Sequence, residues 1–168
     1  MSAPPYLNPG NYVIFAENTT ATTTTSPLQN GRSNFAVTCP LAAGANLTIT
    51  PLTSAANATP AQIWLVTGDG MILSKTTATG QLAQSPIFYA SYTNNVPNIV
   101  TSSGSTNPAP STKFVFNVSQ VAKTDQGDAL SYLATVMTAD NADQFWTIDS
   151  VVKANLKSTS KRFVFVPV

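Results

Sequence analysis

Short apolar runs alternate with polar segments along the whole chain, and the clearest run lies at residues 62–66 (Gln-Ile-Trp-Leu-Val). A turn at residues 67–70 (Thr-Gly-Asp-Gly) separates it from a second apolar run that begins at Met71. Two apolar runs joined by a Gly-Asp-Gly turn predict a β-hairpin. We therefore expect the chain to be built from short strands and tight turns.

The same pattern predicts twelve strands in three sets of four. Alternation of apolar and polar residues is clean at residues 47–50, whereas residues 130–136 fit either a strand or a short helix. The expected strands are residues 11–17, 33–38, 47–50 and 62–66 in the first set, 71–75, 86–92, 98–101 and 113–118 in the second, and 130–136, 144–148, 151–156 and 162–166 in the third.

Aromatic residues mark an internal repeat of about 50 residues. Trp64, Phe114 and Phe163 each lie in the fourth expected strand of a set, and the Phe-Val-Phe that begins at Phe114 occurs again at Phe163. The expected repeats are residues 11–67, 68–118 and 119–168.

A second repeat register is also open. Residues 144–146 (Gln-Phe-Trp) resemble residues 62–64 (Gln-Ile-Trp), and two units of about 41 residues would explain their spacing. That register leaves residues 149–168 outside any repeat. The longer period accounts for the whole chain, and we prefer it.

Three sets of four strands, with a last strand able to pair beside the first, describe a β-trefoil, which is a six-stranded barrel capped by three hairpins. Closing the barrel removes the edges that apolar strands would expose in an open sheet. We expect one all-β domain over residues 1–168. In this fold Trp64, Phe114 and Phe163 are expected to be buried at equivalent positions.

Composition removes most catalytic and cofactor chemistry. Charged residues make up 9% of the chain and the net charge is +1, so no basic surface is expected for nucleic acid or anionic lipid. The chain has no histidine and a single cysteine, Cys39, which excludes a His-based triad, an internal disulfide and the usual zinc sites. We therefore expect no enzyme, no cofactor and no metal. Cys39 is expected to be a buried thiol in a strand.

Nothing in the sequence predicts insertion into a membrane, because no apolar run approaches the ~18 residues of a spanning helix. The first five residues (Met-Ser-Ala-Pro-Pro) have neither the basic start nor the apolar centre of a secretory signal. A cytoplasmic location is therefore expected, unless a leader has been removed. The sequence is compatible with a monomer or a homodimer.

Three segments resemble the small cytoplasmic β-trefoil proteins of mushrooms. They are residues 9–14 (Pro-Gly-Asn-Tyr-Val-Ile), residues 62–67 (Gln-Ile-Trp-Leu-Val-Thr) followed by Asp69 and Gly70, and residues 162–165 (Arg-Phe-Val-Phe). Two groups share these features: the mycocypin and mycospin inhibitors of cysteine and serine proteases, and the ricin-B-like lectins. The resemblance implies a binding or defence protein whose partner is a protease or a glycan.

Protease inhibition is the preferred function. Such inhibitors occupy a protease cleft with loops between early strands and need no catalytic residues. Residues 18–32 form a loop of this kind by position, with a small flexible peptide and a basic side chain for a trypsin-like pocket, and a trefoil brings the loop after the third strand close to it. A plain turn before a strand is the alternative reading of the Asn-Gly pair in this loop. The expected contact residues are Asn30, Gly31, Arg32, Asn57, Ala58 and Thr59.

Carbohydrate binding is the alternative function. Ricin-B-like lectins use an Asp early in a repeat, an aromatic residue that stacks on the sugar and an amide just before the Gln-x-Trp signature. The third repeat matches this pattern loosely through Asp128, Tyr132 and Asn141. The first repeat does not match it, because Ala61 and not an amide residue precedes Gln62. The signature itself is expected to be mainly structural, with the tryptophan in the barrel and the glutamine bound to backbone.

Overall fold

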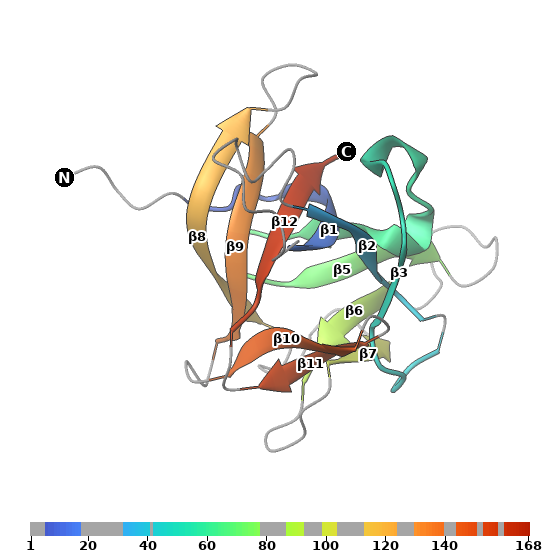
Figure 1. Ribbon diagram of the computed structural model, residues 1–168. Helices are drawn as coiled ribbons and strands as arrows, with labels where there is room; N and C mark the ends of the chain where they lie inside the picture. The colour runs from blue at the N-terminus through green and yellow to red at the C-terminus, as the bar shows by residue number, and fades with distance from the viewer. Residues whose placement is uncertain are drawn as a thin grey trace.

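The computed structural model is an all-β protein whose strands pair antiparallel (Figure 1). It describes residues 6–17, 32–40, 42–77, 87–92, 99–103, 113–123, 130–139, 144–150, 153–157 and 160–168. Within these ranges no helix is long and apolar enough to span a bilayer. The strands are β1 (Gly10–Glu17), β2 (Arg32–Thr38), β3 (Thr48–Pro51), β4 (Ile63–Val66), β5 (Ile72–Thr77), β6 (Ile87–Ser91), β7 (Val100–Ser103), β8 (Phe114–Lys123), β9 (Leu130–Thr138), β10 (Phe145–Ser150), β11 (Lys153–Lys157) and β12 (Arg162–Pro167), and two 3₁₀ helices, η1 (Ala55–Asn57) and η2 (Pro60–Gln62), lie between β3 and β4.

Each of the expected strands is present, with ends shifted by a few residues. Residues 130–136 belong to a strand, β9, because they pair with β8 on one side and with β12 on the other. β8 continues past residue 118 to Lys123. Between Val118 and Gln120 its register with β9 shifts, and pairing then resumes. A bulge of this kind interrupts the period-two pattern, which is why the sequence predicted an earlier end.

The first and last strands of the chain lie side by side. β1 pairs with β12, with Tyr12 opposite Pro167, and on its other side β1 pairs with β4. β12 pairs in turn with β9, β9 with β8, and β4 with β5. An isolated bridge joins Met71, just before β5, to Lys113, just before β8. Five strand pairings and this single bridge thus link six strands in a ring.

The other six strands form three hairpins, β2–β3, β6–β7 and β10–β11. Each set of four strands contributes one of them. The hairpins also touch one another, because Lys153 of β11 pairs with Thr48 of β3, and Asn46 bridges Val100. Figure 1 shows β6, β7, β10 and β11 together at the lower side of the view.

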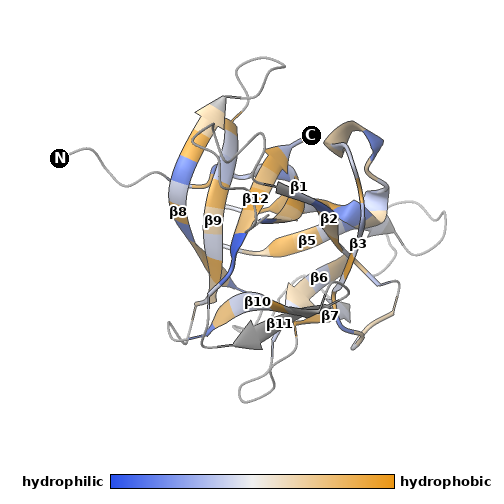
Figure 2. Ribbon diagram, viewed as in Figure 1, coloured by the Kyte–Doolittle hydropathy of each residue, from blue (hydrophilic) through white to orange (hydrophobic). Residues whose placement is uncertain are grey.

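Side chains on β1 alternate between two hydrophobic clusters. Tyr12 and Ile14 belong to the main core, whereas Val13 and Phe15 pack in a second cluster on the opposite face of the strand. All four are buried. The last strand behaves in the same way, and Figure 2 shows the apolar residues that follow one another along β12. Strands buried on both faces explain why these segments are near-continuous apolar runs in the sequence.

The three aromatic markers of the repeat are buried, as expected. Trp64, Phe114 and Phe163 are 0%, 3% and 0% exposed and lie on β4, β8 and β12, the fourth strand of each set. Trp146 contacts Phe114 and Phe163 edge to face, with ring centroids 5.4 and 5.8 Å apart. Trp146 lies on β10, the second strand of its set, so the two Gln-x-Trp segments occupy different places in their sets. The choice between the two repeat registers stays a prediction.

The turn between β4 and β5 packs against the start of β8. Gly70 has a φ of +90°, and its carbonyl oxygen accepts a hydrogen bond from the backbone N–H of Phe114 at 2.9 Å. A Cβ atom at Gly70 would lie 2.2 Å from the carbonyl oxygen of Phe114. Both the backbone conformation and the close approach therefore require glycine.

Candidate functional site

The first predicted contact loop is residues 18–32. Its root, meaning the strand residues at its two ends, lies where β1 ends and β2 begins. Glu17, the last residue of β1, is opposite Arg32, the first residue of β2. Asn30 and Gly31 lie outside the described residues, and for Arg32 the structure describes the backbone. The contact role of these three residues stays a prediction.

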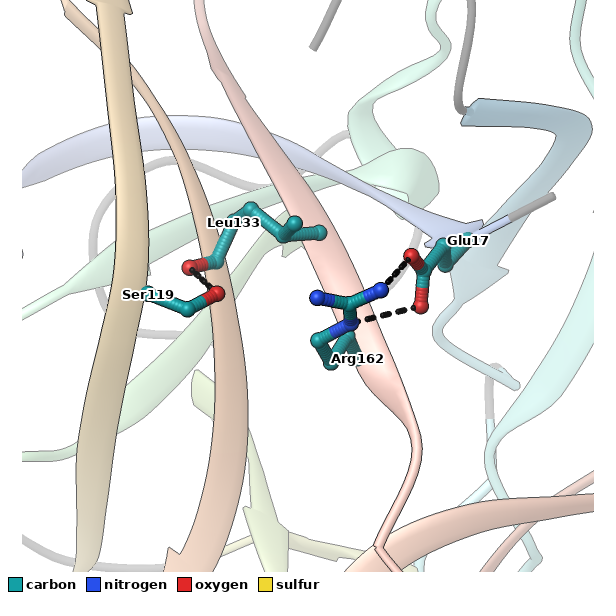
Figure 3. A network of polar contacts seen from close by, with 4 residues as sticks. All are labelled: Glu17, Ser119, Leu133 and Arg162. Atoms are coloured by element: carbon teal, nitrogen blue, oxygen red, sulfur yellow. Dashed lines mark hydrogen bonds and ion pairs between the residues drawn. The ribbon is translucent and has the colours of Figure 1, made fainter. Parts of the chain in front are cut away.

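An ion pair joins this root to the last strand (Figure 3). Arg162 donates from Nε to Oε2 of Glu17 at 3.0 Å and from Nη2 to Oε1 at 2.5 Å. Two contacts from one guanidinium fix its orientation as well as its position. In the same view Ser119, in the β8 bulge, donates its hydroxyl to the carbonyl oxygen of Leu133 at 3.1 Å. The sequence offered no signal for the ion pair, because only the pairing of β1 with β12 brings its partners together.

Apolar residues anchor the second predicted contact loop, residues 52–59, which lies in the connection from β3 to β4. Leu52 is buried in the second hydrophobic cluster, and Ala55 and Ala58 pack against that cluster. The backbone N–H of Leu52 donates to the carbonyl oxygen of Asn34 in β2 at 2.8 Å. The cluster also contains Phe15, two residues before the end of β1. The second loop therefore lies beside the root of the first.

The three predicted contact residues of the second loop do not have the same environment. Asn57 and Thr59 are exposed, whereas Ala58 is half-buried and packs inward. The backbone is extended at Ala58 (φ −64°, ψ 135°) and at Thr59 (φ −77°, ψ 160°). In extended backbone successive side chains point to opposite sides. Ala58 thus anchors the loop, while its two neighbours face solvent.

Gln62 connects this loop to the β2–β3 hairpin. Its Oε1 accepts hydrogen bonds from the backbone N–H of Thr59 at 3.1 Å and from the Thr59 hydroxyl at 3.3 Å. Its Nε2 donates to Oγ1 of Thr50 at 3.0 Å. Thr50 contacts Oγ1 of Thr38 at 2.5 Å, and Thr38 donates to the carbonyl oxygen of Ala36 at 3.0 Å.

The donors in this chain of hydrogen bonds all point the same way. An amide NH₂ and an N–H can only donate, and a carbonyl oxygen can only accept. The single proton of Thr38 is used toward Ala36, so Thr50 donates to Thr38. Aligned hydrogen bonds polarise and strengthen one another. The glutamine predicted to bind backbone does so, and the threonines of β2 and β3 complete its anchorage.

The first Gln-x-Trp signature is structural. Trp64 is fully buried in the main core, and its Nε1 donates to the carbonyl oxygen of Val37 at 2.9 Å. This indole links β4 to β2 and so supports the hairpin on which Gln62 anchors the second loop.

The residues expected of a lectin give no exposed aromatic face. Tyr132 is 1% exposed, and its ring lies edge to face with Tyr12 at a centroid distance of 6.0 Å inside the main core. Such a ring offers solvent no surface on which a sugar could stack. Asp128 and Asn141 lie outside the described residues.

Burial and hydrogen bonding shift the pKa values of Cys39 and Asp69. Cys39 is buried one residue beyond the end of β2, and its burial raises the pKa of its thiol. A hydrogen bond from the Thr67 hydroxyl lowers the pKa of Asp69, and Lys113 at 3.7 Å lowers it further. Among the described residues no group of three or more His, Cys, Asp or Glu side chains could hold a metal.

Comparison of the sequence with models of known protein families gave no match, and comparison with curated proteins gave none.

Proposed function

We propose that this chain is a protease inhibitor of β-trefoil fold, a non-enzymatic binding protein that contacts its target through the loops at residues 18–32 and 52–59. In this proposal the first loop and the exposed residues Asn57 and Thr59 enter the protease cleft together. The target is a cysteine or serine protease, as the resemblance to the mushroom inhibitors implies.

The strand pairings support the β-trefoil. The ring of β1, β4, β5, β8, β9 and β12 has the strand number of a trefoil barrel, and each set of four strands adds one hairpin outside that ring. The hairpins touch one another, as the cap of such a barrel requires. The spacing of the buried aromatic markers is in keeping with a threefold repeat.

The observation that carries the inhibitor proposal is the way in which the second loop is held. Asn57 and Thr59 are exposed, yet the backbone between them is fixed by the inward packing of Ala58 and by the hydrogen bonds of Gln62. A segment that is already ordered loses little conformational freedom when it binds. Its small, uncharged side chains suit a narrow cleft.

A protease panel tests the proposal. Inhibition constants are measured for the intact chain against papain-like and trypsin-like enzymes, and a glycan array is run beside them. We expect saturable inhibition of at least one protease class and no glycan binding. No inhibition together with saturable binding to a glycan would transfer the function to carbohydrate recognition.

Paired variants locate the contact surface. Asn57→Trp places a bulky ring on the exposed face of the second loop, and Gly31→Trp does the same for the first. We expect either change to weaken inhibition by about 2 kcal/mol or more, as for a central interface residue, with an unchanged unfolding midpoint. Asn117→Trp is the control, because Asn117 is exposed on β8, which pairs with β9 and with neither β2 nor β3. Equal inhibition by all three variants would contradict the assigned surface.

A further inference from the structure

We infer that Gln62 is a positioning residue of the second loop, which sets the conformation of residues 57–59 for binding without touching the target itself. The inference rests on the proposed function. Gln62 is 6% exposed, so its side chain is out of reach of a partner that approaches from solvent.

Gln62 binds both polar backbone groups of Thr59. The Gln62 side chain accepts from the N–H of Thr59 at 3.1 Å, and the Gln62 backbone N–H donates to the carbonyl oxygen of Thr59 at 2.8 Å. The Gln62 Oε1 atom also accepts a hydrogen bond from the Thr59 hydroxyl at 3.3 Å. A partner therefore finds no free N–H at Thr59 with which to form a strand-like hydrogen bond.

The amide nitrogen of Gln62 is held by hydrogen bonding, as its amide oxygen is. Nε2 donates to Thr50 of β3, which is in turn bound to Thr38 of β2. Both strands belong to a hairpin whose next neighbour is β1. The loop is thus held by the scaffold that also carries the root of the first loop, and Gln62 couples the positions of the two.

The second Gln-x-Trp segment supplies a matched comparison. Gln144 stands two residues before Trp146 as Gln62 stands before Trp64, but the Oε1 atom of Gln144 is buried and has no hydrogen-bond partner in the described part of the chain. The role of Gln62 therefore comes from its place beside the loop and not from the tripeptide.

The test compares Gln62→Met with Gln144→Met in the full chain, since each change keeps the side-chain length and removes the amide. The first readout is hydrogen exchange at the Thr59 amide, which needs no target. We expect exchange to become at least about ten-fold faster in Gln62→Met, because the N–H loses its acceptor, and to stay unchanged in Gln144→Met. The second readout is the inhibition constant, which we expect to rise about ten-fold for Gln62→Met alone, as ordering the loop becomes part of the cost of binding.

Thr50→Val is a second variant, in case Gln62→Met fails to fold. It keeps the shape of Thr50 and removes the acceptor of Gln62 Nε2, while Oε1 still accepts from Thr59, so we expect the exchange rate and the inhibition constant to fall between those of the parent and Gln62→Met. Equal Thr59 exchange in the parent and Gln62→Met would overturn the inference, and so would unchanged inhibition. If the parent inhibits no protease, the proposed function fails, and the role of Gln62 in inhibition fails with it. If the Thr59 amide of that parent is still protected from exchange, the hydrogen bond from Thr59 to Gln62 is intact, and the two failures can be told apart.

Discussion

At the scale of single residues, the two tryptophans of the core are equally buried but differ in the hydrogen bonding of their indole N–H groups. Both side chains are 0% exposed. The indole N–H of Trp64 donates to the carbonyl oxygen of Val37 at 2.9 Å, whereas that of Trp146 has no partner among the described residues. A buried donor without an acceptor keeps its desolvation cost, while a paired donor recovers it.

Replacing each tryptophan with phenylalanine separates these two cases. Both changes remove similar volume, but Trp64→Phe also leaves the Val37 carbonyl oxygen without its donor, and Trp146→Phe removes an unpaired donor. We expect Trp64→Phe to lower the free energy of unfolding by about 1 to 3 kcal/mol more than Trp146→Phe. Chemical denaturation followed by circular dichroism measures the difference. Equal losses would show that the Trp64 hydrogen bond adds nothing to stability.

At the scale of elements, the turn between β4 and β5 is more than a connection. It brings Gly70 against the first residue of β8, and the bridge between Met71 and Lys113 lies next to this contact. The turn therefore helps to link the fourth and fifth strands to the eighth. A substitution at Gly70 should disturb the pairing of distant elements as well as the local hairpin.

Gly70→Ala tests the contact. The new Cβ would meet the Phe114 carbonyl oxygen at 2.2 Å in a backbone conformation that alanine rarely adopts. We expect a loss of about 2 to 4 kcal/mol in the free energy of unfolding. Gly44→Ala is the matched control, because Gly44 has a φ of +79° but nothing within 4 Å of its Cβ position. It should cost only about 1 kcal/mol for the backbone strain, and equal losses at the two positions would contradict the packing of the turn on β8.

At the scale of the whole molecule, the pairing of β1 with β12 joins the two ends of the chain, and Tyr12 lies at this junction. Its ring packs edge to face against Tyr132 of β9 and Phe165 of β12, each at a centroid distance of 6.0 Å. Its hydroxyl donates to the carbonyl oxygen of Asn8 at 2.7 Å. Burial, together with the neighbouring Tyr132, raises the pKa of Tyr12 from 10.0 to about 12.

The raised pKa makes global stability depend on alkaline pH. Below pH 10 both states keep the phenol proton, and the contribution of Tyr12 to stability is fully present. Between pH 10 and about 12 the unfolded chain loses this proton first, so the free energy of unfolding falls as pH rises. The total fall attributable to Tyr12 is about 2 to 3 kcal/mol.

Tyr12→Phe isolates this contribution. The variant should be less stable by about 1 kcal/mol at pH 8, because it lacks the hydrogen bond to Asn8. As pH rises above 10 this gap should close and then reverse, because the parent loses about 2 to 3 kcal/mol that the variant does not lose. Urea denaturation at a series of pH values measures the gap. Tyr6→Phe is the control, since Tyr6 is 71% exposed and should leave the curve unchanged. Parallel curves for the parent and Tyr12→Phe would contradict the assignment.

The amino-acid pattern by itself determined the local features of this protein. The alternation and spacing of apolar residues predicted the strands, and the Gly-Asp-Gly sequence predicted the β4–β5 hairpin. The recurrence of Trp64, Phe114 and Phe163 predicted that these three aromatic residues lie in the core. These features depend on residues that are close in sequence or on an apolar side chain's preference for the interior, and a linear pattern records both.

Only the tertiary structure decided how these elements meet. The ion pair of Glu17 with Arg162 and the hydrogen bonds from Gln62 to the β2–β3 hairpin join side chains whose partners are chosen by strand pairing. The inward turn of Ala58 depends on the cluster beneath its loop, and β8 runs past its expected end because β9 supplies partners beyond the bulge. In each case the free energy comes from a contact between segments distant along the chain, which a pattern of neighbouring residues does not contain.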